Sequence, residues 1–75
     1  MAEIIVYTKS HCPQCDATKR RLDRLSIPYR TVNLDADPNM VAELTARGFK
    51  QTPIVEAGSE SWSGYRPDLI DKLKA

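Results

Sequence analysis

Residues 4–25, with the sequence IIVYTKSHCPQCDATKRRLDRL, contain the features that decide the fold. The apolar run at 4–8 predicts a strand that is covered on both faces. A Cys-x-x-Cys motif follows at Cys12 and Cys15, and a stripe of residues at steps of three and four then predicts an amphipathic helix. Because the strand ends where the helix begins, Cys12 is expected at the start of the helix.

This placement of the two cysteines favours redox chemistry. Backbone N–H groups and the helix dipole stabilise a thiolate at a helix N-terminus, and the thiolate is the form that attacks disulfides. Cys15 lies one helical turn further on and is expected to close a small disulfide with Cys12. A structural disulfide is disfavoured because so short a loop constrains little of the unfolded chain. We therefore predict that Cys12 and Cys15 are catalytic.

The number of possible metal ligands disfavours a zinc site. Structural zinc takes four Cys or His ligands, whereas this chain has two Cys and one His. A closed site would need a carboxylate or a second chain. We therefore expect no metal, although a zinc-binding module stays an alternative.

Length and charge limit the classes of protein to consider. The chain has 75 residues, which predicts one domain over residues 1–75. Its formal net charge of +1, from 11 Lys+Arg and 10 Asp+Glu, gives no field for nucleic acid or an anionic membrane. The basic residues of the first helix are interpreted as its solvated outer face, interleaved with Asp16 and Asp23, in preference to a docking patch. These basic residues are Lys19, Arg20, Arg21 and Arg24.

The N-terminal apolar stretch does not predict a targeting segment. Its five residues are fewer than a signal-peptide core or a membrane span requires. We therefore expect a protein of the cytoplasm, a reducing compartment in which a Cys pair is more often catalytic than structural.

The middle of the chain predicts a second strand and a second helix. Residues 29–34 have strand propensity and follow a crossover helix, so they are expected to run parallel to the first strand. A helix is predicted between Asp37, its N-cap, and Gly48, its stop. The buried stripe of this helix is predicted to be Met40, Val41 and Leu44.

The C-terminal third predicts a hairpin and a last helix. Two brief strands, at 54–56 and 61–63, are joined by a connection that contains Gly58. Pro67 then opens the last helix, because its fixed φ suits a first helical turn. The predicted order of elements is βαβαββα, an α/β fold.

This order and two motifs resemble a known family. The motif Cys12-Pro13-Gln14-Cys15 after the first strand, with Thr52-Pro53 before the third, resembles the thioredoxin fold in its compact, glutaredoxin-like form. Residues 62–68, WSGYRPD, and residues 48–53, GFKQTP, are similar to signature segments of the NrdH-redoxins. The resemblance covers the whole chain and implies a four-stranded mixed sheet flanked by three helices.

The resemblance also implies an activity and its partners. NrdH-redoxins are dithiol–disulfide electron carriers that take electrons from thioredoxin reductase and deliver them to class Ib ribonucleotide reductase. The implied roles are attack on a substrate disulfide by Cys12 and release of the reduced substrate by Cys15. No cofactor is expected apart from this disulfide, since NADPH is used only by the reductase, and we expect a monomer.

Four further residues are expected to complete the active-site loop. Pro13 fits the first helical turn, although many NrdH-redoxins carry a bulkier apolar residue there. Gln14 is interpreted either as an exposed filler or as a residue that tunes shape and hydrogen bonding. Lys9 and His11 flank the cysteines, where each is either solvated or a charge that favours the thiolate.

The Thr52–Pro53 bond has two interpretations. Most X-Pro bonds in folded proteins are trans, so the sequence alone predicts trans. The resemblance implies a cis bond that faces the Cys pair. It also implies that the backbone of Thr52 pairs with an extended segment of the substrate.

The segment that follows the last strand is expected to contact a protein partner. Trp62 is compatible with a core position, but its alternation with Ser61 and Ser63 at the end of a hairpin leads us to favour a partly exposed docking role. Tyr65 replaces the Phe that is usual in the family. The predicted partner-binding residues are Thr52, Pro53, Trp62, Ser63, Gly64, Tyr65, Arg66 and Pro67.

Two other functions remain open at this point. A glutathione-dependent glutaredoxin binds the glutathione carboxylate at a Gly-Gly turn before its last helix, where this chain has Gly64-Tyr65 and, at the helix start, Pro67 without an N–H. Asp68 could still meet the ammonium group of glutathione. An iron–sulfur carrier would bridge two chains through Cys12 and glutathione.

Overall fold

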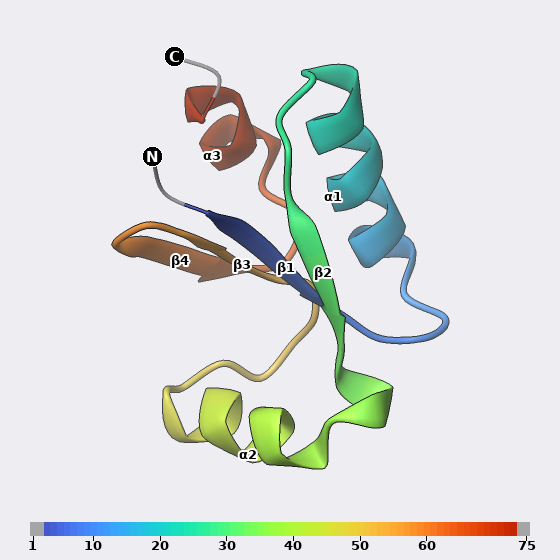
Figure 1. Cartoon of the computed structure of the whole chain (residues 1–75), viewed down its shortest axis with the longest axis vertical. Coiled ribbons are helices and arrows are strands. Elements are labelled where there is room, and N and C mark those ends of the chain that lie inside the picture. The colour runs from blue at the N-terminus through green and yellow to red at the C-terminus, as the bar shows by residue number, and fades with distance from the viewer. Residues whose placement is uncertain (1–2, 74–75) are drawn as a thin grey trace.

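The computed structural model describes residues 3–73, and residues 1, 2, 74 and 75 of the predicted domain lie outside the described part. The predicted order βαβαββα is confirmed, with one added 3-10 turn (Figure 1). In chain order the elements are β1 (Ile4–Thr8), α1 (Pro13–Arg24), β2 (Arg30–Asn33), η1 (Leu34–Ala36), α2 (Pro38–Ala46), β3 (Ile54–Ala57), β4 (Glu60–Ser63) and α3 (Pro67–Lys72).

The four strands form one mixed sheet in the order β2-β1-β3-β4. Strand β1 pairs in parallel with β2 and antiparallel with β3, so that Val6 lies opposite Thr31 on one side and Val55 on the other. Strands β3 and β4 form the predicted hairpin, with Val55 opposite Trp62. The inner position of β1 explains its nearly continuous apolar sequence.

Helices cover both faces of the sheet. Figure 1 shows α1 and α3 on one face and α2 on the other. Because successive side chains of a strand point to opposite faces, Val6 and Tyr7 belong to different cores. The core beneath α1 and α3 comprises Val6, Leu22, Ile27, Val55, Trp62 and Ile70. The core beneath α2 comprises Tyr7, Leu34, Leu44 and Ile54.

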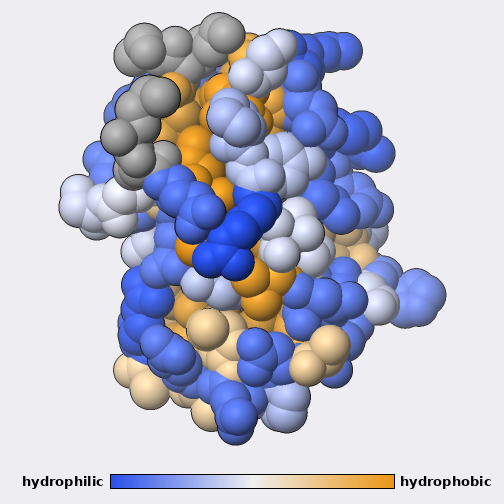
Figure 2. Space-filling model, in the orientation of Figure 1, coloured by the Kyte–Doolittle hydropathy of each residue, from blue (hydrophilic) through white to orange (hydrophobic). Residues whose placement is uncertain are grey.

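The first helix has the predicted two faces. Pro13 occupies its first turn, and Cys15, Thr18 and Leu22 form the buried stripe. The outer side of α1 is hydrophilic, as the sequence predicted (Figure 2). Helix α1 therefore starts at the cysteines and is held against the sheet along its length.

One prediction about the middle of the chain was wrong, and another needs its bounds corrected. The second strand, predicted at residues 29–34, covers Arg30–Asn33. It ends at Asn33, where the side chain accepts a hydrogen bond from the N–H of Asp35 at 2.9 Å and η1 starts. Val41 is 41% exposed instead of buried. Met40 and Leu44 lie four residues apart on one face of α2 and fill the core contact, whereas Val41 is rotated to the edge of the helix.

A polar contact links the end of α2 to the sheet. The Tyr7 hydroxyl donates to Glu56, and the other carboxylate oxygen of Glu56 accepts from Arg47 at 2.9 Å. Burial and this hydrogen bond raise the pKa of Tyr7 to about 12. The same hydrogen bond is the main cause that lowers the pKa of Glu56. Strand β3 is thus anchored just after the segment that contains Thr52.

Candidate active site

The two cysteines form a disulfide at the start of α1. Cys12 is the N-cap of the helix and Cys15 lies in its first turn, with their Cα atoms 5.2 Å apart. Cys15 is fully buried, whereas 8% of Cys12 is exposed. Cys12 therefore stands at the start of the helix, as predicted, and it is the more exposed of the two sulfurs, although neighbouring segments cover most of it.

Two groups contact the Cys12 sulfur. The backbone N–H of Cys15 donates to it at 3.2 Å, and the Thr52 hydroxyl lies 3.5 Å away. The first N–H groups of a helix have no intrahelical partner, so such a donor also suits a thiolate. The helix end therefore supplies the local positive potential that the sequence placed there.

The segment before β3 lies directly beside the disulfide. The Thr52–Pro53 peptide bond is cis, as the resemblance implied. Pro53 is buried, and its carbonyl accepts a hydrogen bond from the N–H of Gly64 at 2.8 Å. The cysteine loop, the proline segment and the segment after β4 thus meet at one end of the sheet.

Gln14 joins the active-site motif to the segment after β4. Its side-chain oxygen accepts a hydrogen bond from the backbone N–H of Tyr65 at 3.2 Å. Gly64 has a φ of +84°, a left-handed conformation that favours glycine, and this turn directs the Tyr65 N–H toward Gln14. Gln14 is exposed, and this hydrogen bond gives it a specific contact with the segment after β4.

Lys9 and His11 lie at the mouth of the site, and both are exposed. His11 has a φ of +58°, which is uncommon for a non-glycine residue and places the turn immediately before Cys12. The N–H of Ser10, between them, donates to the Asp35 carboxylate at 2.8 Å. Hydrogen bonds from Ser10 are the main cause that lowers the pKa of Asp35.

Asp35 is a site residue that the sequence analysis missed. It follows β2, which runs parallel to β1, and the carboxyl ends of parallel strands meet at the same edge of a sheet. That rule places Asp35 next to the loop after β1 and would have found it. Its role in the structure is to fix the loop that leads to Cys12.

A groove runs from Thr52 toward α2. It has a volume of about 390 Å³ and combines an apolar floor with two lysines. Lys9, Lys50 and Thr52 contribute polar groups, while Val41 and Phe49 contribute apolar ones. The exposed edge of α2 therefore becomes one wall of a surface beside the disulfide.

The prediction of a partly exposed docking role for Trp62 was wrong. Only 7% of this residue is exposed, and its side chain packs in the core with Val6, Leu22 and Ile70. The alternation along β4 is real, but it directs Trp62 inward because α1 and α3 cover that face of the sheet. An indole in this position stabilises the fold and is out of reach of a partner.

The rest of the predicted docking segment is at the surface. Ser63, Gly64 and Pro67 are half-buried, and Tyr65 is 37% exposed. Arg66 forms a two-point contact with Asp68, at 3.2 and 3.0 Å. That ion pair raises the pKa of Arg66 and lowers the pKa of Asp68. Asp68 is therefore already engaged by a cation of the same chain.

Residues 3–73 contain no group of three or more His, Cys, Asp or Glu side chains arranged to hold a metal ion. Within the same residues, none of the helices has the length and apolar character needed to cross a bilayer.

Known proteins match this chain over nearly its whole length. The family model described as Glutaredoxin matches residues 4–62. The glutaredoxin-like protein NrdH of Salmonella typhimurium is 46% identical over 70 residues, which cover 93% of this chain and 86% of that protein. The Escherichia coli protein of the same name is 44% identical over the same shares.

A solved structure matches as well. The NrdH-redoxin of Escherichia coli superposes with a TM-score of 0.93 at 44% identity, over 95% of this chain and 93% of that one. That protein is described as having a thioredoxin-like activity profile. The chain belongs to the NrdH-redoxins of the glutaredoxin family.

Membership in this family agrees with the geometry of the site. This chain has the thioredoxin fold that the resemblance implied, a four-stranded mixed sheet flanked by three helices. It is a thiol–disulfide oxidoreductase, and Cys12 and Cys15 are at disulfide distance. Of the predicted site residues, Gln14, Thr52, Pro53, Gly64 and Tyr65 gather around these cysteines, while Trp62 lies in the core beneath α1 and α3.

Proposed function

We propose that this NrdH-redoxin is an electron carrier that thioredoxin reductase reduces and that donates electrons to class Ib ribonucleotide reductase. The observation that carries the proposal is the Cys12–Cys15 disulfide at the helix start, in a chain 44% identical to a redoxin with a thioredoxin-like activity profile. We place the protein in the cytoplasm, where a reductase that uses NADPH keeps such a pair reduced.

In the proposed cycle, Cys12 is the attacking thiolate and Cys15 is the resolving thiol. The Cys12 sulfur attacks one sulfur of the substrate disulfide, so that a mixed disulfide forms and the other substrate sulfur leaves as a thiolate. Cys15, as a thiolate, then attacks the Cys12 sulfur, and the second substrate sulfur leaves. Two electrons pass to the substrate, which takes up two protons, and Cys12–Cys15 is oxidised.

The geometry supports this division of labour. Cys12 retains some exposure and accepts the Cys15 N–H, whereas Cys15 is closed to a large partner. The helix N-terminus stabilises the Cys12 thiolate as the nucleophile that attacks the substrate disulfide. No further cofactor is needed, because the reductase delivers electrons from NADPH to the same disulfide.

Two segments are proposed to receive protein partners. An extended segment of the partner would pair with the backbone at Thr52 and place side chains in the adjacent groove. Tyr65 would pack against the partner on the other side of the motif, since Gln14 holds its backbone there. We propose that a monomer presents both surfaces.

Glutathione is disfavoured as the electron source by the residues before and in α3. Asp68, the carboxylate expected to meet the glutathione ammonium group, is paired with Arg66. Pro67 offers no N–H at the start of α3, and Tyr65 stands where a second glycine would allow close approach. Binding glutathione here would require breaking the Arg66–Asp68 pair without gaining the usual donors.

A trapping experiment tests the roles of the cysteines. Cys15→Ser is expected to accumulate a mixed disulfide on Cys12 with an oxidised protein partner, because no thiol remains to resolve it. Cys12→Ser is the matched control and should show neither adduct nor turnover. Mass spectrometry of each mixture locates the adduct, and a stable adduct on Cys15 of the control would contradict the assignment.

A further inference from the structure

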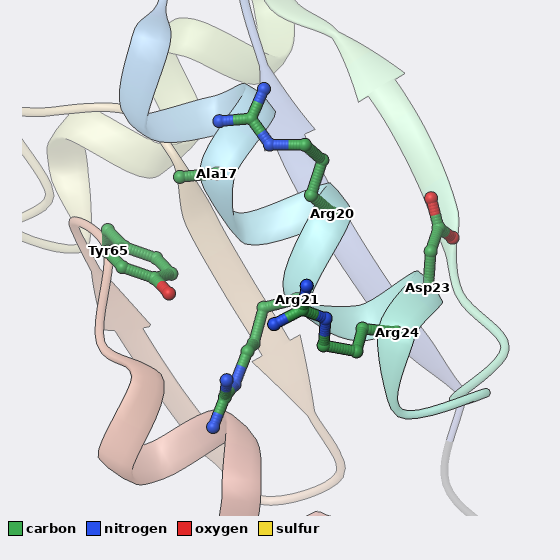
Figure 3. A pocket seen from close by; sticks show the side chains of 6 residues that line it. All are labelled: Ala17, Arg20, Arg21, Asp23, Arg24 and Tyr65. Carbon is green, nitrogen blue, oxygen red and sulfur yellow. The ribbon is translucent and has the colours of Figure 1, made fainter.

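A second hollow lies on the outer side of α1, next to the segment that precedes α3. It has a volume of about 580 Å³. Figure 3 shows three arginines and Tyr65 around the same space. The lining residues are Ala17, Arg20, Arg21, Asp23, Arg24 and Tyr65. We call this hollow the arginine groove.

The arginine groove concentrates positive charge. Arg20 and Arg24 form no ion pair with any residue between 3 and 73, whereas Arg21 is fixed by Asp71 through two contacts at 2.9 and 2.8 Å. Asp23 also lines the groove, but it forms no ion pair with Arg20 or Arg24, and its carboxylate lies on the side of α1 next to β2, away from Tyr65 (Figure 3). A chain with a net charge of +1 thus presents, at one place, two arginines without carboxylate partners among residues 3–73.

The arginine groove adjoins the active site through Tyr65. Tyr65 forms its aromatic wall, and the backbone of Tyr65 is bound to Gln14 of the Cys-x-x-Cys motif. Residues at steps of three and four share one face of a helix, so Gln14, Ala17, Arg21 and Arg24 form a single line along α1. A partner that reaches the disulfide over Gln14 therefore meets the arginines next.

We propose that the arginine groove binds an acidic segment of the proteins whose disulfides this redoxin exchanges. The inference rests on the proposed function and adds a recognition element to it. Guanidinium groups favour carboxylates, and an exposed tyrosine beside them supplies apolar contact area. Ten residues of α1 span about 15 Å, so the acidic residues fall within about five extended residues of the partner's disulfide.

Two synthetic peptides test this recognition. Both carry the same intramolecular disulfide and have the same length, but one has a run of Asp and Glu beside the disulfide and the other has Asn and Gln. The reduced redoxin is mixed with each, and the second-order rate constant for peptide reduction is measured. We expect the acidic peptide to react about tenfold faster at low salt. At about 0.5 M salt the preference should nearly vanish.

Single-charge variants locate the effect. Arg20→Gln and Arg24→Gln are each expected to lower the ratio of the acidic to the neutral rate constant by about threefold at low salt. Lys72→Gln is the matched control, because Lys72 is exposed on α3 outside the groove and its replacement removes the same charge. The control should leave the ratio unchanged.

The outcomes distinguish a failure of the recognition proposal from a failure of the proposed function. Equal rate constants for the two peptides would overturn the proposal for the arginine groove while the proposed function stands. So would an equal fall in the ratio of the acidic to the neutral rate constant in Lys72→Gln and Arg24→Gln. Failure to reduce either peptide would contradict the proposed function itself. Binding of a single-stranded oligonucleotide that depends on Arg20 and Arg24, with no peptide preference, would assign the groove to nucleic acid and overturn the inference.

Discussion

The segment 62–66 divides into an inner and an outer half that differ in burial. The inner half, Trp62 and Ser63, completes β4 and places an indole in the core beneath α1 and α3. The outer half, Gly64 to Arg66, leaves the sheet at a left-handed glycine and exposes Tyr65 beside Gln14. Two aromatic side chains three residues apart thus have opposite environments.

This difference indicates that residues 62–66 combine a structural element with a proposed recognition element. Trp62 of the inner half packs in the core, and the outer half forms the surface around Tyr65. Gly64 connects them, because its N–H binds the Pro53 carbonyl and its φ of +84° sends the next residue outward. Substitutions in the two halves are therefore expected to affect different properties.

The largest effect is expected from removing the indole. Trp62→Ala would leave a cavity in the core and should lower the free energy of unfolding by about 3–5 kcal/mol, which is a large part of the stability of a domain this small. Urea denaturation followed by circular dichroism measures it. A loss below about 1 kcal/mol would place Trp62 among surface residues and remove the distinction between the two halves.

Trp62→Phe is the matched control for that prediction. The indole Nε1 is buried without a hydrogen-bond partner among residues 3–73. Phenylalanine keeps an aromatic ring in the core and removes this unsatisfied donor, which offsets part of the lost packing. The control should therefore cost much less than Trp62→Ala in the same denaturation experiment.

An intermediate effect is expected at the glycine between the halves. Gly64→Ala places a Cβ at ordinary contact distance from Gln14, 3.7 Å, so its cost of about 1–2 kcal/mol comes from the positive φ. Gly48→Ala is the control, since Gly48 has a φ of +97° and open space around it. Both variants should lose similar stability, but only Gly64→Ala should also raise the KM for thioredoxin reductase. An equal KM in both would contradict a role for the turn.

The smallest effect on stability is expected at the outer aromatic residue. Tyr65→Ala should change the free energy of unfolding by less than about 0.5 kcal/mol, because the side chain is exposed. It should raise the KM for thioredoxin reductase about fivefold through lost contact area. Tyr65→Phe keeps the ring and should retain the KM. Denaturation and NADPH-coupled kinetics measure the two properties, and an unchanged KM for Tyr65→Ala would exclude the outer half from docking.

Most of the fold could be predicted because its signals are local. The apolar run of β1, the periodicity of α1 and the Pro–Gly punctuation of α2 each lie within a few residues of the element they define. The cysteines were placed at a helix start by the same reasoning. Local patterns do not state which side of a short strand or helix faces the core, which explains the wrong predictions for Trp62 and Val41.

The contacts that build the site could be predicted only in part. Asp35 binds the loop before Cys12 from 25 residues away, and Gln14 binds Tyr65 across 51 residues. Such pairs depend on how the strands are ordered in the sheet, which the sequence gives only through the resemblance. The arginines of α1 are interpreted from the sequence as a solvated helix face because Tyr65, which forms the other wall of the groove, comes from a distant segment.

We propose that this redoxin takes its electrons from thioredoxin reductase and not from glutathione. The most direct measurement compares NADPH oxidation with one disulfide acceptor in two systems, thioredoxin reductase or glutathione with glutathione reductase, at equal redoxin concentration. We expect fast turnover with thioredoxin reductase and slow turnover with glutathione, because Asp68 is already paired with Arg66 and Pro67 has no N–H to donate. Equal or faster turnover through glutathione would contradict this proposal.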